Sequence, residues 1–163
     1  MSILGELTLL FLLICLCVSA YYIYREKHIN KTKMSFKESM DLAELPIVTF
    51  YQDNIKLNFL LDTGSNVSYI NESILSAIKY TKTNESKSTI GVEGIPLHSE
   101  YCIIKISYKE KQFEDKFSIL DLNNAFDTVK QESGVQIHGI LGSKFFEKYK
   151  YVLDFKDLIA YIK

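Results

Sequence analysis

The sequence contains no tryptophan, and only two prolines and seven glycines among its 163 residues. Low-complexity and disordered chains are usually rich in proline and glycine and poor in aromatic residues, so this composition argues against that class. The chain has 11 tyrosines and 10 phenylalanines instead, and aromatic side chains are common in strands. We therefore expect an aromatic-rich β-protein, long enough for one compact domain with accessory segments.

An excess of charge and a set of paired cysteines are also absent. The 19 basic and 20 acidic residues give a net charge of -1, so we expect no basic surface for nucleic acid and no nucleic-acid partner. Cys15 and Cys17 lie in an apolar segment and Cys102 is isolated, so the cysteine positions predict no disulfide framework. The three histidines lack cysteine or histidine partners at zinc-site spacing. We predict no metal ion and no cofactor.

The segment from Leu7 to Tyr24 contains no charged residue and is about long enough to cross a bilayer core of roughly 30 Å. We therefore predict a transmembrane anchor over residues 1-24. Basic residues follow only on its C-terminal side, beginning with Arg25 and Lys27, so the positive-inside rule predicts that the rest of the chain is cytoplasmic. A cleaved signal peptide is the alternative, because Val18-Ser19-Ala20 has small residues suited to cleavage.

Residues 25-44 are polar and mixed in charge, and we expect a solvated tether with a short helix near Met40. From residue 45 to 163 the pattern changes to short β-rich runs separated by turn signals. Helices are expected only at Glu72–Ile78 and Lys144–Tyr149, and the segment from Thr81 to Ser88 is expected to be a loop. A strand is expected at 89-95, running into a glycine-bounded tip. The other expected elements are three hairpins, with arms at 45-51 and 55-61, at 101-108 and 112-120, and at 152-155 and 158-162.

Two short motifs carry the chemistry. Leu60-Leu61-Asp62-Thr63-Gly64-Ser65 places an Asp-Thr-Gly-Ser turn directly after an apolar strand, and Ile137-His138-Gly139-Ile140-Leu141-Gly142 follows some eighty residues later. Together they resemble the retropepsin-like aspartic proteases. The resemblance covers roughly residues 45-163 and implies a mostly-β, closed acid-protease barrel in which Ile140, Leu141 and Gly142 pack beside the catalytic loop.

The resemblance implies a function and an oligomeric state. Peptide hydrolysis without a covalent intermediate needs one group to deprotonate water and another to protonate the carbonyl oxygen, and two close carboxylates that share a proton meet this need. The motif occurs once, so the second catalytic Asp62 would come from another copy across a two-fold axis. We thus predict a membrane-anchored, homodimeric aspartic endopeptidase that acts on extended protein or peptide substrates.

The resemblance also assigns roles around Asp62. Thr63 would bind the opposite loop through its hydroxyl, Gly64 would let its backbone approach the carboxylates or substrate, and Ser65 could donate a hydrogen bond to Asp62. Gly91, Val92, Glu93 and Gly94 resemble the tip of a flap that closes over substrate.

The sequence departs from the retroviral members at one pair of positions. Those members have an aspartate just beyond the catalytic loop and an arginine after the apolar-apolar-glycine segment, whereas this chain has Asn66 and Ser143-Lys144.

A second functional hypothesis is a catalytically silent peptide-binding or dimerisation module, because a fold does not fix a function. The intact Asp62, Thr63 and Gly64 favour the protease, since a binding module has no need of the acid. An Asp62→Asn substitution separates the two, because it removes turnover and leaves binding. A further carboxylate, Asp154, is expected to begin a turn instead of joining the dyad.

Overall fold

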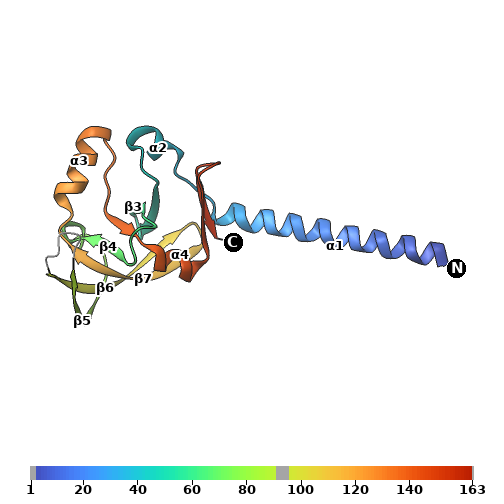
Figure 1. Ribbon diagram of the computed structural model, residues 1–163, viewed down its shortest axis with the longest axis horizontal. Helices are drawn as coiled ribbons and strands as arrows, with labels where there is room; N and C mark the ends of the chain where they lie inside the picture. The colour runs from blue at the N-terminus through green and yellow to red at the C-terminus, as the bar shows by residue number, and fades with distance from the viewer. Residues whose placement is uncertain (1–2, 91–95, 163) are drawn as a thin grey trace.

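The computed structural model describes residues 3–90 and 96–162. A long helix, α1 (Ile3–Thr32), projects from a small β-rich body that holds the rest of the chain (Figure 1). Six strands close into a barrel in the order β2 (Ile47–Gln52), β3 (Ile55–Leu61), β8 (Gly139–Leu141), β4 (Ser68–Asn71), β7 (Lys111–Leu120) and β6 (Pro96–Tyr108). β6 returns to β2 through the pair Tyr51 and Ser107. The predicted fold class, a closed mostly-β barrel preceded by an apolar helix, is confirmed.

The first hairpin consists of β2 (Ile47–Gln52) and β3 (Ile55–Leu61), as the sequence predicts. Asp53 adopts a positive φ of 52° in its turn, a conformation that Asp tolerates better than most residues. Alternate side chains of β3 face the core, namely Leu57, Phe59 and Leu61. This alternation fixes the register, because a slip of one residue would turn the three apolar side chains outward. The strand therefore ends reproducibly just before Asp62.

The second hairpin is larger than expected. β6 (Pro96–Tyr108) pairs with β7 (Lys111–Leu120), and β5 (Thr81–Ile90) adds a further strand to the outer edge of β6. The prediction that Thr81–Ser88 forms a loop is therefore wrong. The described side chains of β5 are mostly exposed, so this edge strand needs no apolar alternation and looks like a loop in the sequence.

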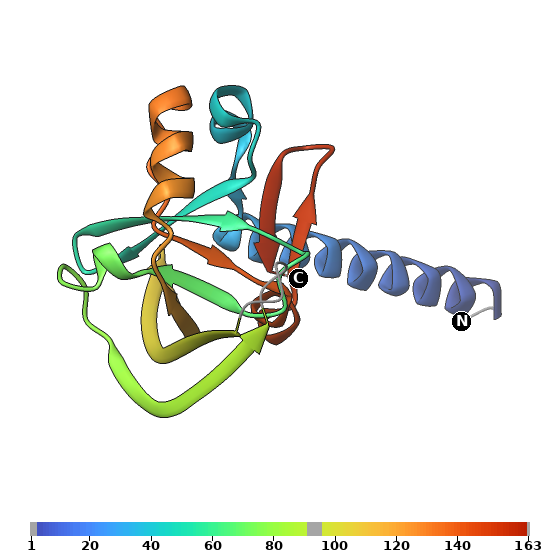
Figure 2. The ribbon, with the colours of Figure 1, turned by 60° about the vertical axis from the view of Figure 1, so that its left-hand side comes forward.

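The helices of the body also differ from the prediction. The helix expected at Glu72–Ile78 is only a 3₁₀ turn, η1 (Glu72–Ile74). α2 (Lys37–Ala43) and α4 (Ser143–Tyr149) lie where short helices were expected, but α3 (Asn123–Ser133) was missed. The axes of α2 and α3 lie side by side on one side of the barrel (Figures 1 and 2).

The expected tether contributes to the body. β1 (Met34–Ser35) pairs with β10 (Ile159–Ile162), which pairs with β9 (Tyr151–Asp154), so the segment just after α1 and the C-terminal hairpin form a small second sheet. Met34 and Phe36 are buried at 2% and 1% exposure. The solvated spacer expected over residues 25-44 is thus replaced by the end of α1, a core-forming strand and α2. The folded body begins at Met34, because these apolar side chains fill the space beside β10.

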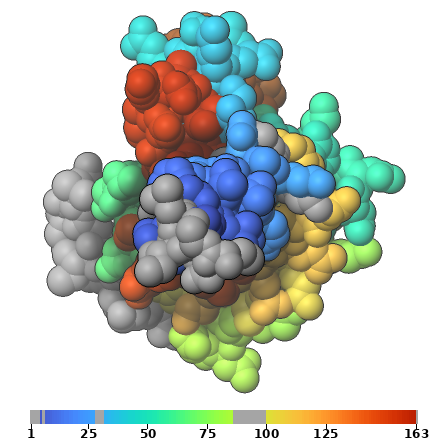
Figure 3. Space-filling view, turned by 90° about the vertical axis from the view of Figure 1, so that its right-hand side faces the viewer, coloured from blue at the N-terminus to red at the C-terminus, as the bar shows by residue number. Residues whose placement is uncertain are grey.

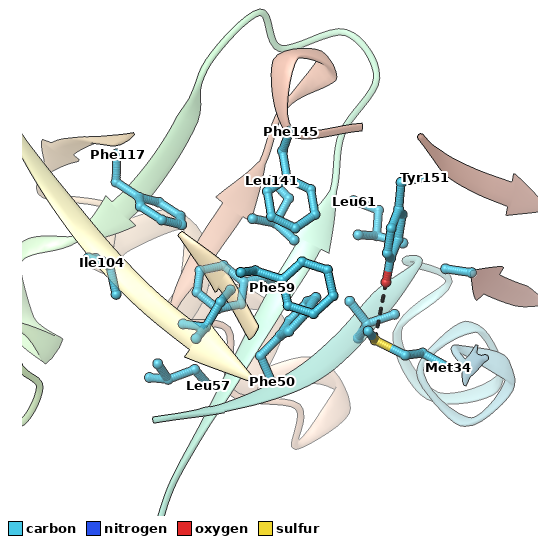
Figure 4. Packing of buried hydrophobic residues seen from close by; sticks show 14 of the residues in the cluster. Met34, Phe50, Leu57, Phe59, Leu61, Ile104, Phe117, Leu141, Phe145 and Tyr151 are labelled. Carbon is cyan, nitrogen blue, oxygen red and sulfur yellow. Dashed lines mark hydrogen bonds between the residues drawn. The ribbon is translucent and has the colours of Figure 1, made fainter. Parts of the chain in front are cut away.

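The largest buried cluster lies inside the barrel and under α4 (Figure 4). Phe145 from α4 packs against Phe50 and Phe113 with ring centroids 6.1 and 5.8 Å apart. Buried Tyr151 donates its hydroxyl to the Met34 sulfur at 3.1 Å. Because α4 begins directly after Gly142, this aromatic packing holds the segment that the sequence predicts beside the Asp62 loop.

Candidate active site

The Asp62 loop connects two strands that are not neighbours in the sheet, because a third strand lies between them. The loop of residues 62–67 connects β3 to β4 (Ser68–Asn71), and β8 (Gly139–Leu141) runs between them, parallel to β3 and antiparallel to β4. The close approach of β8 to β4 requires a glycine at position 139, because a Cβ there would lie 2.5 Å from the Tyr69 carbonyl oxygen. The predicted pair of motifs is thereby brought together.

The turn presents the Asp62 carboxylate in a defined orientation. The Asp62 backbone N–H donates to the Leu141 carbonyl at 3.0 Å, which extends the β3 to β8 pairing into the loop. The Gly64 N–H donates to Asp62 Oδ1 at 2.9 Å. Thr63 and Gly64 are exposed, whereas Asp62 is half-buried. The carboxylate is therefore held in one orientation beside an exposed turn.

Ser65 makes a different contact from the one expected. Its hydroxyl donates to the Val67 carbonyl at 2.8 Å instead of to the Asp62 carboxylate. Its backbone carbonyl accepts the Ser143 N–H, also at 2.8 Å. Ser65 therefore shapes the loop and connects it to the start of α4, and the hydrogen bond observed on the carboxylate comes from the Gly64 backbone.

Gly142 lies directly against the loop. A Cβ at this position would be 2.4 Å from the Val67 carbonyl oxygen and 3.0 Å from the Ser65 carbonyl oxygen. No side chain fits there without moving backbone atoms. The physical task of the glycine in Ile140-Leu141-Gly142 is therefore to let two loop backbones touch, one of which carries Asp62.

A polar network behind the loop was missed from the sequence. The Ser68 hydroxyl donates to Asp115 Oδ2 at 2.8 Å and accepts the Gly142 N–H at 3.3 Å. Lys148 Nζ lies 3.9 Å from Asp115 Oδ1. Burial raises the pKa of Asp115, and the hydrogen bonds from Ser68 and the Lys116 backbone and the charge of Lys148 partly offset this rise. The sequence signal that could have revealed this network is Asp115 itself, because it alternates with Phe113 and Phe117 and so shares their face of β7.

His138 connects β3 to the strand that supports the loop. Its Nδ1 accepts the Asn58 N–H at 3.0 Å, while its own backbone N–H donates to the Asn58 carbonyl at 2.9 Å. Burial, followed by the charge of Lys130, lowers the pKa of His138. The neutral imidazole thus serves as a structural acceptor just before β8.

The remaining predicted residues fall into two groups. Asp154 caps its own turn, since its Oδ1 accepts the Lys156 and Asp157 backbone N–H groups at 2.9 and 3.2 Å, as expected. Gly91, Val92, Glu93 and Gly94 lie outside the described residues, and β5 and β6 pair as far as Ile90 and Pro96 on either side of them. Within the described residues, no three His, Cys, Asp or Glu side chains are grouped as a metal site requires.

Comparison with known proteins gives structural matches only. No family model and no curated protein matches the sequence. A retropepsin-like aspartic protease from Rickettsia conorii is 18% identical with a TM-score of 0.44, over 71% of this chain and 79% of that chain. The retroviral protease-like domain of Ddi1 from Leishmania major is 12% identical with a TM-score of 0.48, over 73% and 88%. The EIAV protease is 17% identical with a TM-score of 0.45, over 66% and 90%.

The resemblance therefore depends on features of this chain itself. These are the closed barrel, the exposed Asp-Thr-Gly loop after β3, and the glycine of Ile140-Leu141-Gly142 packed against that loop. They are the features that the sequence resemblance to the retropepsin-like aspartic proteases implies.

Proposed function

We propose that the chain is an aspartic endopeptidase whose catalytic dyad forms from the Asp62 residues of two copies. The observation that carries the proposal is the Asp62 turn: a half-buried carboxylate oriented by the Gly64 N–H at 2.9 Å, next to exposed Thr63 and Gly64. One chain supplies one such turn. An isologous contact between two copies would place the two turns together at a two-fold axis.

In this mechanism the two Asp62 carboxyl groups share one proton, because two like charges at contact distance cannot both ionise. The ionised carboxylate takes a proton from water as the water attacks the peptide carbonyl, and the protonated one donates to the carbonyl oxygen. The Gly64 N–H would remain on Asp62 Oδ1 and hold the carboxylate in place. Thr63, which is exposed at the tip, would contact the partner loop.

We further propose that α1 anchors the enzyme in a membrane. Within the described residues, one helix, over Leu7–Lys27, is long and apolar enough to span a bilayer, and it is unburied; signal sequences share this length and composition. Arg25, Lys27 and Lys33 follow the apolar run, which favours a cytoplasmic body.

The structure of the junction favours a body held close to the bilayer. α1 continues five residues past Lys27 to Thr32, about 7.5 Å of helix. There the Thr32 hydroxyl accepts the Ile162 N–H at 3.1 Å, so the helix is attached directly to β10. Viewed along α1, the described part of the body extends above, to the right of and below the helix (Figure 3). Substrates would therefore be cut in segments near the membrane surface.

The test is cleavage of a peptide library by the full chain in detergent or nanodiscs between about pH 4 and 7. We expect cleavage by the wild type, none by Asp62→Asn, and inhibition by a statine-type transition-state mimic. Asp157→Asn, at an exposed turn carboxylate, is the matched control and should cleave normally. A folded dimer that binds peptides without cutting them would instead identify a peptide-binding module.

A further inference from the structure

Asp115 occupies a position where the β7 pattern calls for an apolar residue. Successive side chains of a strand alternate between faces, and the core-facing neighbours of Asp115 are Phe113 and Phe117, with 1% and 0% exposure. The Asp115 side chain itself is only 13% exposed. Burying a carboxylate is costly unless its oxygens are hydrogen-bonded, and burial raises the pKa of Asp115. A carboxyl group at this place therefore costs stability compared with an apolar side chain.

The contacts of Asp115 lead directly to the catalytic loop. Its Oδ2 accepts the hydroxyl proton of Ser68, which is the first residue after the loop. An ionised carboxylate can only accept, so the Ser68 hydroxyl must donate its single proton to Asp115. The Ser68 oxygen is then left to accept the Gly142 N–H, at 3.3 Å. Without the carboxylate, the Ser68 hydroxyl would be free to rotate and would no longer be held as the acceptor of the Gly142 N–H.

Asp115 also faces α4, the element on the other side of Gly142. Lys148 Nζ lies 3.9 Å from Asp115 Oδ1, and the same ammonium donates to the Glu114 carbonyl. The Tyr149 hydroxyl donates to that carbonyl at 2.8 Å. β7 therefore contacts both the exit of the Asp62 loop and the end of α4. The pair that the retroviral members use near this loop is absent here, where Asn66 and Ser143-Lys144 occupy its positions.

We propose that Asp115 is a positioning residue: through the Ser68 hydroxyl it fixes the loop that carries Asp62 against the Gly142 backbone. This inference rests on the proposed protease function. Asp115 itself does not touch the reacting atoms. Its effect is to keep the Asp62 carboxylate in the position and orientation that a dyad formed by two copies needs. A displacement of about 1 Å from that geometry can lower the rate about a hundredfold.

The first experiment measures kcat and KM of full-length variants on one peptide that the wild type cleaves. We expect Asp115→Ala and Ser68→Ala each to lower kcat by about 10- to 100-fold, with KM within about threefold of wild type. The double variant should be no worse than the worse single, because both act through one contact. Glu114→Ala is the matched control: its exposed side chain pairs with Lys105 on the other face of β7, and its kcat should not change.

A second variant separates positioning from stability. Asp115→Asn keeps an oxygen that can accept the Ser68 proton but loses the charge. Because burial disfavours the charged form of Asp115, this variant should melt at or above the wild-type temperature and, with the Ser68 hydrogen bond kept, retain a kcat close to wild type, whereas Asp115→Ala should not. Wild-type kcat in Asp115→Ala would overturn the proposal, as would a loss of kcat no larger than the loss of folded protein.

Hydrogen exchange decides the inference even if the protease proposal fails. If the wild type cuts nothing, the protease proposal is refuted, and exchange at the Gly142 amide tests Asp115 on its own. Faster exchange of the segment 139–143 in Asp115→Ala, with β2 and β3 still protected, supports the positioning role. Unchanged protection of that segment contradicts it.

Discussion

The Gly142→Ala substitution tests whether close backbone contact positions the catalytic loop. The added Cβ would lie 2.4 Å from the Val67 carbonyl oxygen, and Cβ atoms are essentially never found closer than 3.0 Å to such an atom. The loop must therefore move by about 0.6 Å or more. Overpacking of this kind costs about 1–3 kcal/mol, which lowers the melting temperature by roughly 3–12 °C. Because Asp62 belongs to the displaced loop, kcat should fall by about 10- to 100-fold.

Gly134→Ala is the matched control for this change. Gly134 has a φ of 76° at the end of α3, and a Cβ there would meet nothing within 4 Å. The left-handed conformation costs a residue with a side chain about 1–2 kcal/mol, so both variants should lose stability. Only Gly142→Ala should lose activity in peptide cleavage by the folded protein. Wild-type turnover in Gly142→Ala would refute the claim that this contact sets the loop.

Three further outcomes are expected. Phe145→Ala should lower the free energy of unfolding by about 3–5 kcal/mol in denaturant titration, because it removes a fully buried ring at the centre of the aromatic cluster. The melting temperature should fall as the pH drops below about 6.5, because His138 has a lowered pKa in the folded state and the unfolded chain binds the proton first; thermal melts of His138→Gln should lack this component. A flexible insert of about 20 residues after Lys27 should extend the reach of the anchored body by roughly 25 Å. Membrane reporters whose cleavage site is held rigidly about 50 Å from the bilayer should then be cut by the insert variant and not by wild type.

The sequence predicts the elements whose patterns are local. The turn at Asp62 and the glycine at Gly142 are recognisable because each needs specific residues at its own position. The β2 to β3 hairpin follows from apolar alternation around Asp53. The part of β5 at Thr81–Ser88 was missed because an exposed edge strand carries no apolar alternation, and α3 was missed although Phe126 and Val129 have helical spacing.

The remaining errors concern partners distant in sequence. Met34 and Phe36 lie in a polar segment, and only the position of β10 shows that they are buried. The sequence suggested the Asp62 carboxylate as the acceptor of the Ser65 hydroxyl, whereas in the folded loop the acceptor is the Val67 carbonyl. Asp115 lies 47 residues from Ser68 along the chain, so its role depends on the parallel pairing of β4 and β7, which no local pattern specifies.

Subunit mixing tests the two-copy dyad most directly. Wild type and Asp62→Asn are reconstituted together at equal total protein, with exchange between copies allowed before the cleavage assay. If each active site needs Asp62 from both copies, an equal mixture retains about one quarter of the wild-type activity, as random pairing about a two-fold axis requires. If each chain acts alone, about one half remains, and that result would contradict the account.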